Sequence, residues 1–359
     1  MSALVKSSPP QRFLMRVGSA APIIQAPMAG AGGIDLAIAV IRGGGIGSLP
    51  CALIDPATSI AQAAAVRAAA PGPLNLNFFC HVLPEAVDET RWHALLAPYY
   101  AEYGVGPPAT PPPLRQPFDA TMCAAVAQIR PEIVSFHFGL PEDALLDRVR
   151  VTGALILSSA TTVAEARWLA ARGVDMIIAQ GFEAGGHAGR FLPRPPGTAM
   201  GLFALLPQIV DAVDVPVIAA GGIGDARGIA AAFALGASAV QIGTAYLHTP
   251  EATIGAAHRA LLSSEAAETT RLTNVITGRP ARGLPNRLIE EHGPINDAAP
   301  PFPHASTALA ALRSAAEALG RTDFSTMWSG QAARLGTAES AEALTRRLAD
   351  AALALRARL

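Results

Sequence analysis

The feature that most constrains the fold is an alternation of short apolar runs with alanine-rich segments of helical length. Apolar strands that alternate with helices are typical of a parallel sheet covered by helices on both faces. Eight such units match the size of a closed (β/α)₈ TIM barrel, with an open doubly wound sheet as the alternative. The apolar runs are residues 21–28, 45–50, 74–79, 132–138, 154–159, 174–180, 215–220 and 239–244.

The segments between these runs carry helical periodicity and helix-end signals. Residues 162–173, TVAEARWLAARG, repeat apolar residues at spacings of three and four. Residues 225–236, DARGIAAAFALG, begin with Asp225, a residue suited to cap a helix N-terminus. Gly236 lies just past the expected end of that helix. Both segments are therefore predicted to be helices that follow barrel strands.

Two parts of the chain exceed a minimal barrel. The third connection contains the Pro-rich residues 103–117, which we expect to form an extended loop or polyproline II. After the eighth apolar run the sequence is mainly helical, with a Pro-rich interruption at 298–306. We therefore divide the chain into a barrel, residues 1–264, and a mainly helical C-terminal segment, residues 265–359, that packs on the barrel mouth.

Charge and cysteine content exclude several classes of function. A net charge of −1 leaves no basic excess for nucleic acid or a membrane surface. Charged residues, Pro or Gly interrupt the apolar runs well short of the roughly 18 residues that a membrane span needs, and the N-terminus lacks the apolar core of a signal peptide. Three scattered cysteines favour neither a disulfide framework nor a zinc site. We expect a cytoplasmic globular protein.

Polar side chains and glycines gather where the predicted strands end, which is the rim that carries active sites in such barrels. Gly221, Gly222 and Gly224 lie between the seventh strand and a helix start, and Gly243 with Thr244 ends the eighth strand. Free N–H groups at these two neighbouring loops favour a phosphate group. The alternative is that the glycines only make tight turns.

The ligand that would carry this phosphate is not fixed by composition. Asn75 alternates with Leu74 and Leu76, so its amide faces the side of the strand opposite to the leucines. Amides that point inward, such as Asn75 and Gln180, suit the donors and acceptors of a flavin or a purine ring. Both ring systems remain open at this point.

A single histidine, His187, follows the sixth strand inside the glycine-rich segment AQGFEAGGHAGRF, residues 179–191. A neutral imidazole at a strand end is suited to act as a general base or a hydrogen-bonding group. The alternative is an ordinary loop histidine. His81 and His137 do not combine with His187 into a metal site, because no pair has the i, i+3 or i, i+4 spacing of ligands.

Six segments together carry a family resemblance. They are IIQAPMAG, LNLNFFCH, VSFHFGLP, QGFEAGGHAGRF, VIAAGGIGDARG and VQIGTAYL, in that order. They resemble the class I branch of the nitronate monooxygenases, also called 2-nitropropane dioxygenases, over about residues 15–290. Residues 323–336 are similar to the C-terminal segment of that family.

The resemblance implies a barrel that holds FMN and no metal, and that oxidises alkyl nitronates with O₂ to a carbonyl compound and nitrite. His187 then matches the catalytic histidine, and His137 a second histidine of the substrate pocket. The implied cofactor positions are Ala26, Pro27 and Met28 at the isoalloxazine, Asn75 and Gln180 as hydrogen-bonding amides, Gly185 and Gly186 beside the ring, and Gly222, Gln241, Gly243 and Thr244 at the phosphate, with Gly221 in the same loop as Gly222.

Several alternatives stay open. An NAD(P)H-dependent reductase of quinones or enoyl thioesters would share the barrel and the phosphate loops, and a non-catalytic flavin-binding module would share the cofactor site. Trp328 and Met327 would either cover the pocket or pack in a core, and Glu183 would be a second acid or base or a solvated carboxylate. A homodimer is expected, while the physiological substrate and the use of neutral nitroalkanes are left undetermined.

Overall fold

The computed structural model describes residues 7–107, 114–195 and 197–356, and its centre is an eight-stranded parallel sheet with the order β1-β9-β8-β6-β5-β4-β3-β2. A parallel bridge between Ile24 and Ile46 joins the first strand to the segment leading into the second, and this bridge closes the barrel. The predicted (β/α)₈ barrel is therefore confirmed, and the open sheet is excluded. The strands are β1 (Ile23–Gln25), β2 (Gly47–Pro50), β3 (Leu74–Phe79), β4 (Ile133–His137), β5 (Leu155–Ala160), β6 (Met176–Gln180), β8 (Val217–Ala220) and β9 (Ala239–Ile242).

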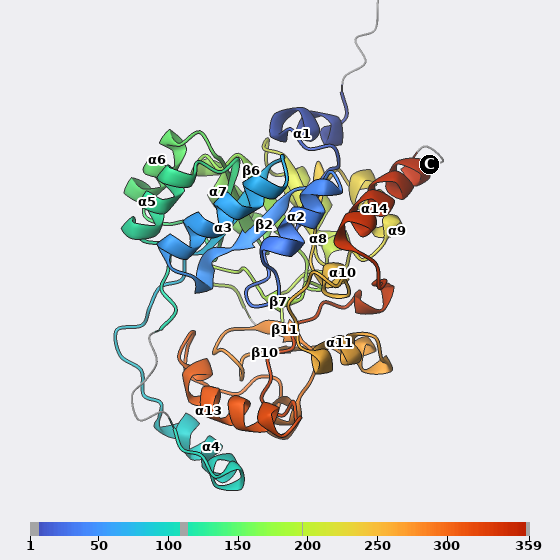
Figure 1. Cartoon of the computed structure of the whole chain (residues 1–359). Helices are drawn as coiled ribbons and strands as arrows, with labels where there is room; N and C mark the ends of the chain where they lie inside the picture. The colour runs from blue at the N-terminus through green and yellow to red at the C-terminus, as the bar shows by residue number, and fades with distance from the viewer. Residues whose placement is uncertain (1–6, 108–113, 196, 357–359) are drawn as a thin grey trace, which may run out of the picture.

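Helices surround the barrel and bury the outward faces of its strands (Figure 1). The Thr162 hydroxyl caps one predicted helix, and the Asp225 carboxylate accepts from two backbone N–H groups at the start of the other. Gly236 lies past the second helix with φ +98°, which L side chains rarely adopt. The barrel helices are α2 (Ile34–Arg42), α3 (Pro56–Ala69), α5 (Ala120–Ile129), α6 (Asp143–Val151), α7 (Val163–Ala171), α8 (Leu202–Val210), α9 (Ala226–Ala234) and α14 (Ala341–Arg356), with the 3₁₀ turn η1 (Cys51–Leu53) after β2.

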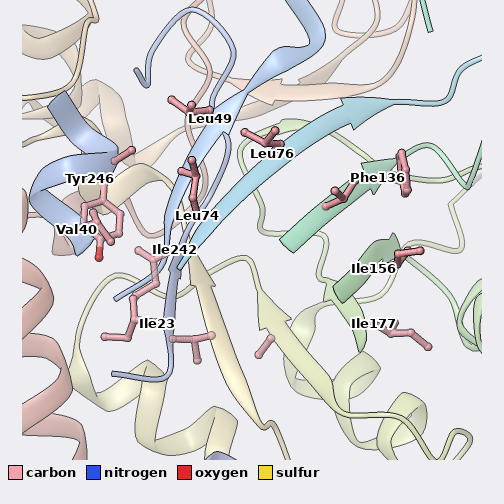
Figure 2. Packing of buried hydrophobic residues seen from close by; sticks show 14 of the residues in the cluster. Ile23, Val40, Leu49, Leu74, Leu76, Phe136, Ile156, Ile177, Ile242 and Tyr246 are labelled. Carbon is pink, nitrogen blue, oxygen red and sulfur yellow. The ribbon is translucent and has the colours of Figure 1, made fainter. Parts of the chain in front are cut away.

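Strand alternation explains the two sides of the barrel wall. Leu74 and Leu76 of β3 lie in the large apolar cluster between strands and helices, part of which Figure 2 shows. Asn75 and Asn77, which alternate with these leucines, bond instead to polar groups of the neighbouring strands β2 and β4, respectively.

The two ends of the barrel interior differ in polarity. Phe13 and Val17 of the N-terminal helix α1 (Pro9–Val17) pack against Ile24, Ile133 and Ile218 from the interior, so α1 plugs this end with apolar side chains. At the other end the interior positions are polar, and this is where the strands finish. The polar end is therefore the open one.

A cap covers the polar end (Figure 1). We define the cap as residues 248–335 together with α4 (Thr90–Tyr103), because α4 packs on α13 (Ala305–Ala318). Trp92 donates to the Ala305 carbonyl at 3.2 Å, and Tyr100 donates to Ala308 at 2.7 Å. The remaining elements of the cap are α11 (Ala256–Leu262), η2 (Glu265–Glu268), β10 (Arg271–Thr273), β11 (Ala281–Gly283), α12 (Arg287–His292) and η3 (Ala333–Leu335).

The cap has its own hydrophobic core, separate from that of the barrel. The last helix, α14, returns to the barrel and packs between α9 and α2. The division at residue 264 remains a prediction about folding units, but the packing places α4 with the cap and α14 with the barrel. Of the Pro-rich residues 103–117, those at 108–113 lie outside the described residues.

Candidate active site

A cavity of about 1380 Å³ lies between the strand ends and the cap. The catalytic, substrate and cofactor positions implied by the resemblance line it except Asn75, and Gly224 of the predicted phosphate loop does not line it either. These lining residues are Ala26, Pro27, Met28, His137, Gln180, Gly185, Gly186, His187, Gly221, Gly222, Gln241, Gly243 and Thr244. The fold therefore brings together residues that are more than two hundred positions apart in the chain.

The backbone of His187 is held on both sides. Residues Gly186–His187 form the short strand β7, which pairs antiparallel with β11 of the cap. The His187 carbonyl accepts hydrogen bonds from Gln180 Nε2 at 3.0 Å and from His137 Nε2 at 3.1 Å. Gln180 Oε1 also accepts from the N–H of Gly189 at 2.6 Å. The segment around His187 is thus a short strand that is hydrogen-bonded to both the barrel and the cap.

The imidazole of His187 is oriented by Thr277, a residue of the β10–β11 connection. Thr277 Oγ1 lies 2.9 Å from His187 Nε2 and donates its proton to the carbonyl of Arg279 at 3.3 Å. We assign the hydroxyl proton of Thr277 to the Arg279 carbonyl, which makes Nε2 the donor to Thr277 and the imidazole the Nε2–H tautomer. Nδ1 makes no hydrogen bond to the described residues and keeps its lone pair. A free lone pair is what a general base needs.

Aromatic rings surround the His187 ring. Its centroid lies 5.3 Å from that of Phe302 and 5.5 Å from that of Trp328, with Phe79 and Phe138 at 6.1 and 5.9 Å. Burial, followed by the charge of Arg115, holds the pKa of His187 well below its ordinary value. His187 is therefore neutral at pH 7.

His137 has both ring nitrogens occupied. Nε2 donates to the His187 carbonyl, so Nδ1 is the acceptor and receives the Ser159 hydroxyl at 3.1 Å. Burial lowers the pKa of His137 to about 4, which keeps the ring neutral. His137 borders the cavity as expected, and its nitrogens position His187.

Some glycines in this region are required because neighbouring protein atoms pack closely against them, and not only because they border the cavity. A Cβ on Gly185 would lie 2.5 Å from the backbone nitrogen of Gly330, and one on Gly189 would lie 2.7 Å from the His137 ring. Gly186 has φ +71°, which favours glycine in its own right. Gly243 is different, because its Cβ would meet only Ala26 and Met28, at 3.4 Å or more.

Two buried amide oxygens lack partners among the described residues, and one of them, on the cavity wall, supports a flavin there. Asn75 donates to Ser48 at 2.9 Å, but its Oδ1 has no partner among the described residues. Gln241 Oε1, on the cavity wall, is also buried without a partner. An unpaired buried acceptor is costly, and the N–H of a flavin ring in the cavity would satisfy Gln241 Oε1. The residues present therefore fit a flavin.

Glu183 has a structural task. Both of its carboxylate oxygens accept from the N–H of Leu202, at 2.9 Å each, at the start of α8. These hydrogen bonds at the helix start explain why a carboxylate stands on the cavity wall, and no catalytic role is needed to explain it. Trp328 and Met327 do line the cavity, and a bridge between Trp328 and Gly283 ties this segment to β11.

Sequence reasoning missed the contributions of Thr277, Phe302 and Arg115. Each lies in a connection of irregular structure, and nothing in its local sequence indicates that it faces the strand ends. Only the pairing of β7 with β11 brings Thr277 to His187.

Within residues 7–107, 114–195 and 197–356, His, Cys, Asp and Glu side chains form no group of three that could hold a metal. Over those same ranges, no helix combines the length and apolar character needed to cross a membrane.

Comparisons with known proteins agree with this geometry. The family model described as nitronate monooxygenase matches residues 12–350. A nitronate monooxygenase of Pseudomonas aeruginosa is 40% identical over 94% of this chain and 98% of its own length. One from Paraburkholderia phytofirmans is 40% identical over 94% of this chain and 93% of its own.

Solved structures give the same result. A nitroalkane oxidase from Streptomyces ansochromogenes has a TM-score of 0.86 and 36% identity, and the match covers 95% of this chain and 98% of the other. FabK from Thermotoga maritima has a TM-score of 0.72 and 24% identity over 97% and 99% of the two chains, which is a likeness of fold. The family match spans almost the entire chain and includes every strand of the barrel and the cap, so the chain belongs to the nitronate monooxygenase family.

Proposed function

We propose that this protein binds FMN and oxidises alkyl nitronates with O₂ to a carbonyl compound and nitrite, and that it also accepts neutral nitroalkanes. Membership of the family makes the chain an oxidoreductase and implies a flavin. The observation that carries the proposal for neutral substrates is the neutral His187, whose Nδ1 is free on the wall of the cavity.

The floor of the cavity would hold the cofactor. The unpaired oxygen of Gln241 is suited to the N–H of the isoalloxazine, Ala26, Pro27 and Met28 line the same wall, and Asn75 lies beneath this floor. Gly222, Gly243 and Thr244 would cradle the phosphate at the ends of β8 and β9. The chemistry that FMN supplies when bound is electron transfer between substrate and O₂.

His187 would supply the proton chemistry. With a neutral nitroalkane, Nδ1 takes the proton from the carbon next to the nitro group, and Nε2–H stays on Thr277. The resulting imidazolium lies beside the anion that it has created, so the two charges stabilise each other in a poorly hydrated site. A nitronate is already ionised, and for this substrate His187 orients rather than deprotonates.

The surrounding rings exclude water from this step. Phe79, Phe138, Phe302 and Trp328 place apolar rings around the imidazole and would limit the water next to it once substrate is bound. A substrate alkyl chain would be received by the same apolar surfaces. The reductase alternative has only the shared fold in its favour.

The proposal is tested with the purified protein. We expect a yellow protein that releases FMN, and not FAD, on denaturation, because the glycine loops after β8 and β9 are suited to a single phosphate group. Under anaerobic conditions, an alkyl nitronate should bleach the flavin faster than NADH does. A protein that cannot be loaded with FMN, or one that NADH alone reduces, would refute the proposal.

A homodimer and a cytoplasmic location remain proposals from the sequence. Light scattering of the purified protein and fractionation of cells would test them.

A further inference from the structure

We propose that Arg115 is an anion-binding residue of the cavity and that its guanidinium binds the two oxygens of the NO₂ group of the substrate. This inference rests on the proposed function for the identity of the substrate, but the anion site itself can be tested separately. Arg115 lies on the cavity wall, in the connection between β3 and α5.

The position of Arg115 relative to His187 is the first support. The guanidinium carbon lies 5.5 Å from the ring centroid of Phe79 and 5.4 Å from that of Phe302. The same two rings flank the imidazole of His187, at 6.1 and 5.3 Å. Arg115 and His187 thus border one aromatic pocket, and a small substrate inside it can meet both.

The absence of a counter-charge is the second support. Arg115 forms no ion pair or side-chain hydrogen bond with the described residues, and its Nε is buried without a partner. The residues outside the described ranges contain no Asp or Glu that could pair with it. Burial alone accounts for the lowering of the pKa of Arg115 to about 10, and no carboxylate offsets it.

Each described carboxylate on the cavity wall binds a group other than Arg115. Asp55 and Asp119 cap the starts of α3 and α5, Glu183 binds the start of α8, and Glu317 accepts from Ser325. By contrast, Arg321, another arginine on the wall, is paired with Glu102 and Asp323. A guanidinium held by rings and left without an anion is a site that lacks its ligand.

The shape of the guanidinium specifies the class of ligand. Its planar fork binds two oxygens at once, and carboxylate, nitronate and nitrite all present such a pair. Of these, the nitronate is the one whose carbon must also reach His187. Arg115 would therefore bind the charged NO₂ group and orient the reactive carbon toward Nδ1.

Inorganic nitrate and nitrite are probes that need no turnover. We would titrate them calorimetrically into the FMN-loaded protein, in which the phosphate cradle is already filled. Loss of a charge-assisted bidentate contact predicts that Arg115→Gln weakens nitrate binding by roughly 10- to 100-fold. Arg115→Lys keeps the charge but not the planar fork, so it should recover only part of this loss.

The matched control is Arg172→Gln. Arg172 also stacks on an aromatic ring, with its guanidinium carbon 3.6 Å from the centroid of Trp168, but it lies outside the cavity. This variant should bind nitrate like the unmodified protein. Nitrate binding that is unchanged in Arg115→Gln, or lost equally in Arg115→Gln and Arg115→Lys, would overturn the inference.

The two proposals fail separately. If nitrate binding depends on Arg115 but no nitronate is oxidised, the anion site stands and the proposed function falls. If nitronates are oxidised with the same KM in Arg115→Gln as in the unmodified protein, the function stands and the assignment of Arg115 falls.

Discussion

The floor and the cap side of the cavity are built in different ways. On the floor, polar side chains stand at the ends of barrel strands and bond mostly to their neighbours, as Asn77 does with Ser135 and His137 does with Ser159. On the cap side, three residues from loops of the cap surround His187. They are Thr277, Phe302 and Trp328. A regular scaffold thus supplies the proposed cofactor positions, and the irregular loops of the cap shape the proposed substrate pocket.

This difference indicates a division of labour. Changes on the floor should affect flavin retention first, because the strand ends and their loops form the cradle. Changes on the cap side should affect reaction and selectivity while the flavin stays bound.

The largest effect is expected at His187, where the two sides meet. His187→Asn should retain FMN but lose activity on neutral nitroalkanes by roughly two to four orders of magnitude, the usual contribution of a positioned base. Oxidation of pre-formed nitronates should fall much less, because no proton has to be removed. Steady-state rates with both substrates, at equal flavin content, provide the measurement. Equal losses on the two substrates would remove the general-base role.

The next effect concerns the floor. Gly243→Asp should weaken FMN binding by about 100-fold, because a carboxylate replaces attraction of the phosphate with repulsion. Gly243 is the better site for this test than Gly222. At Gly222, φ is +69°, and a Cβ would lie 3.2 Å from Glu183, so the fold itself would be strained.

A fluorescence titration of the apoprotein with FMN measures this affinity. Gly33→Asp is the control, because a Cβ at Gly33 meets nothing within 4 Å and Asp is a good residue at the start of α2. FMN affinity that is unaltered in Gly243→Asp would place the phosphate elsewhere.

A smaller effect is expected from the cap side at Thr277. Thr277→Val removes the acceptor for Nε2–H and frees the imidazole to change tautomer, so the rate on neutral nitroalkanes should fall about tenfold. Thr277→Ser should restore it, since the hydroxyl returns. Flavin content should be the same in all three proteins. Failure of the Ser variant to recover activity would mean that packing of the methyl group, and not the hydrogen bond, is what matters.

The smallest effect is that of pH. The base form of His187 is the neutral one, present above its pKa and lost as the pH falls through that value. Because that pKa lies well below its ordinary 6.5, kcat/KM for a neutral nitroalkane should change less than about twofold between pH 6.5 and 8. An ionisation in this window that disappears in His187→Asn would contradict the neutral, buried environment.

The fold was predictable where the signal is local. Each barrel strand is a short apolar run, and Asp225 and Thr162 cap their helices through contacts within a few residues. The position of α14 was not predictable in this way, because a long insertion separates it from the strand that precedes it. Its packing on α2 and α9 is decided by tertiary contacts alone.

The site residues, too, were predictable only where the sequence signal is local. Gln180 and Gly243 stand at strand ends and could be found from the pattern. Asn75 was found for its inward amide, yet it lies beneath the cavity lining and offers one unpaired oxygen. Thr277 and Arg115 could not be found, since their roles depend on contacts with residues far away in the sequence.

The most direct test of the account is oxygen uptake measured together with nitrite release, using the FMN-loaded protein and a pre-formed alkyl nitronate. The account predicts that both occur, that Gly243→Asp loses them unless FMN is supplied in excess, and that His187→Asn keeps its flavin throughout. A protein that holds FMN but produces no nitrite from any alkyl nitronate would contradict it.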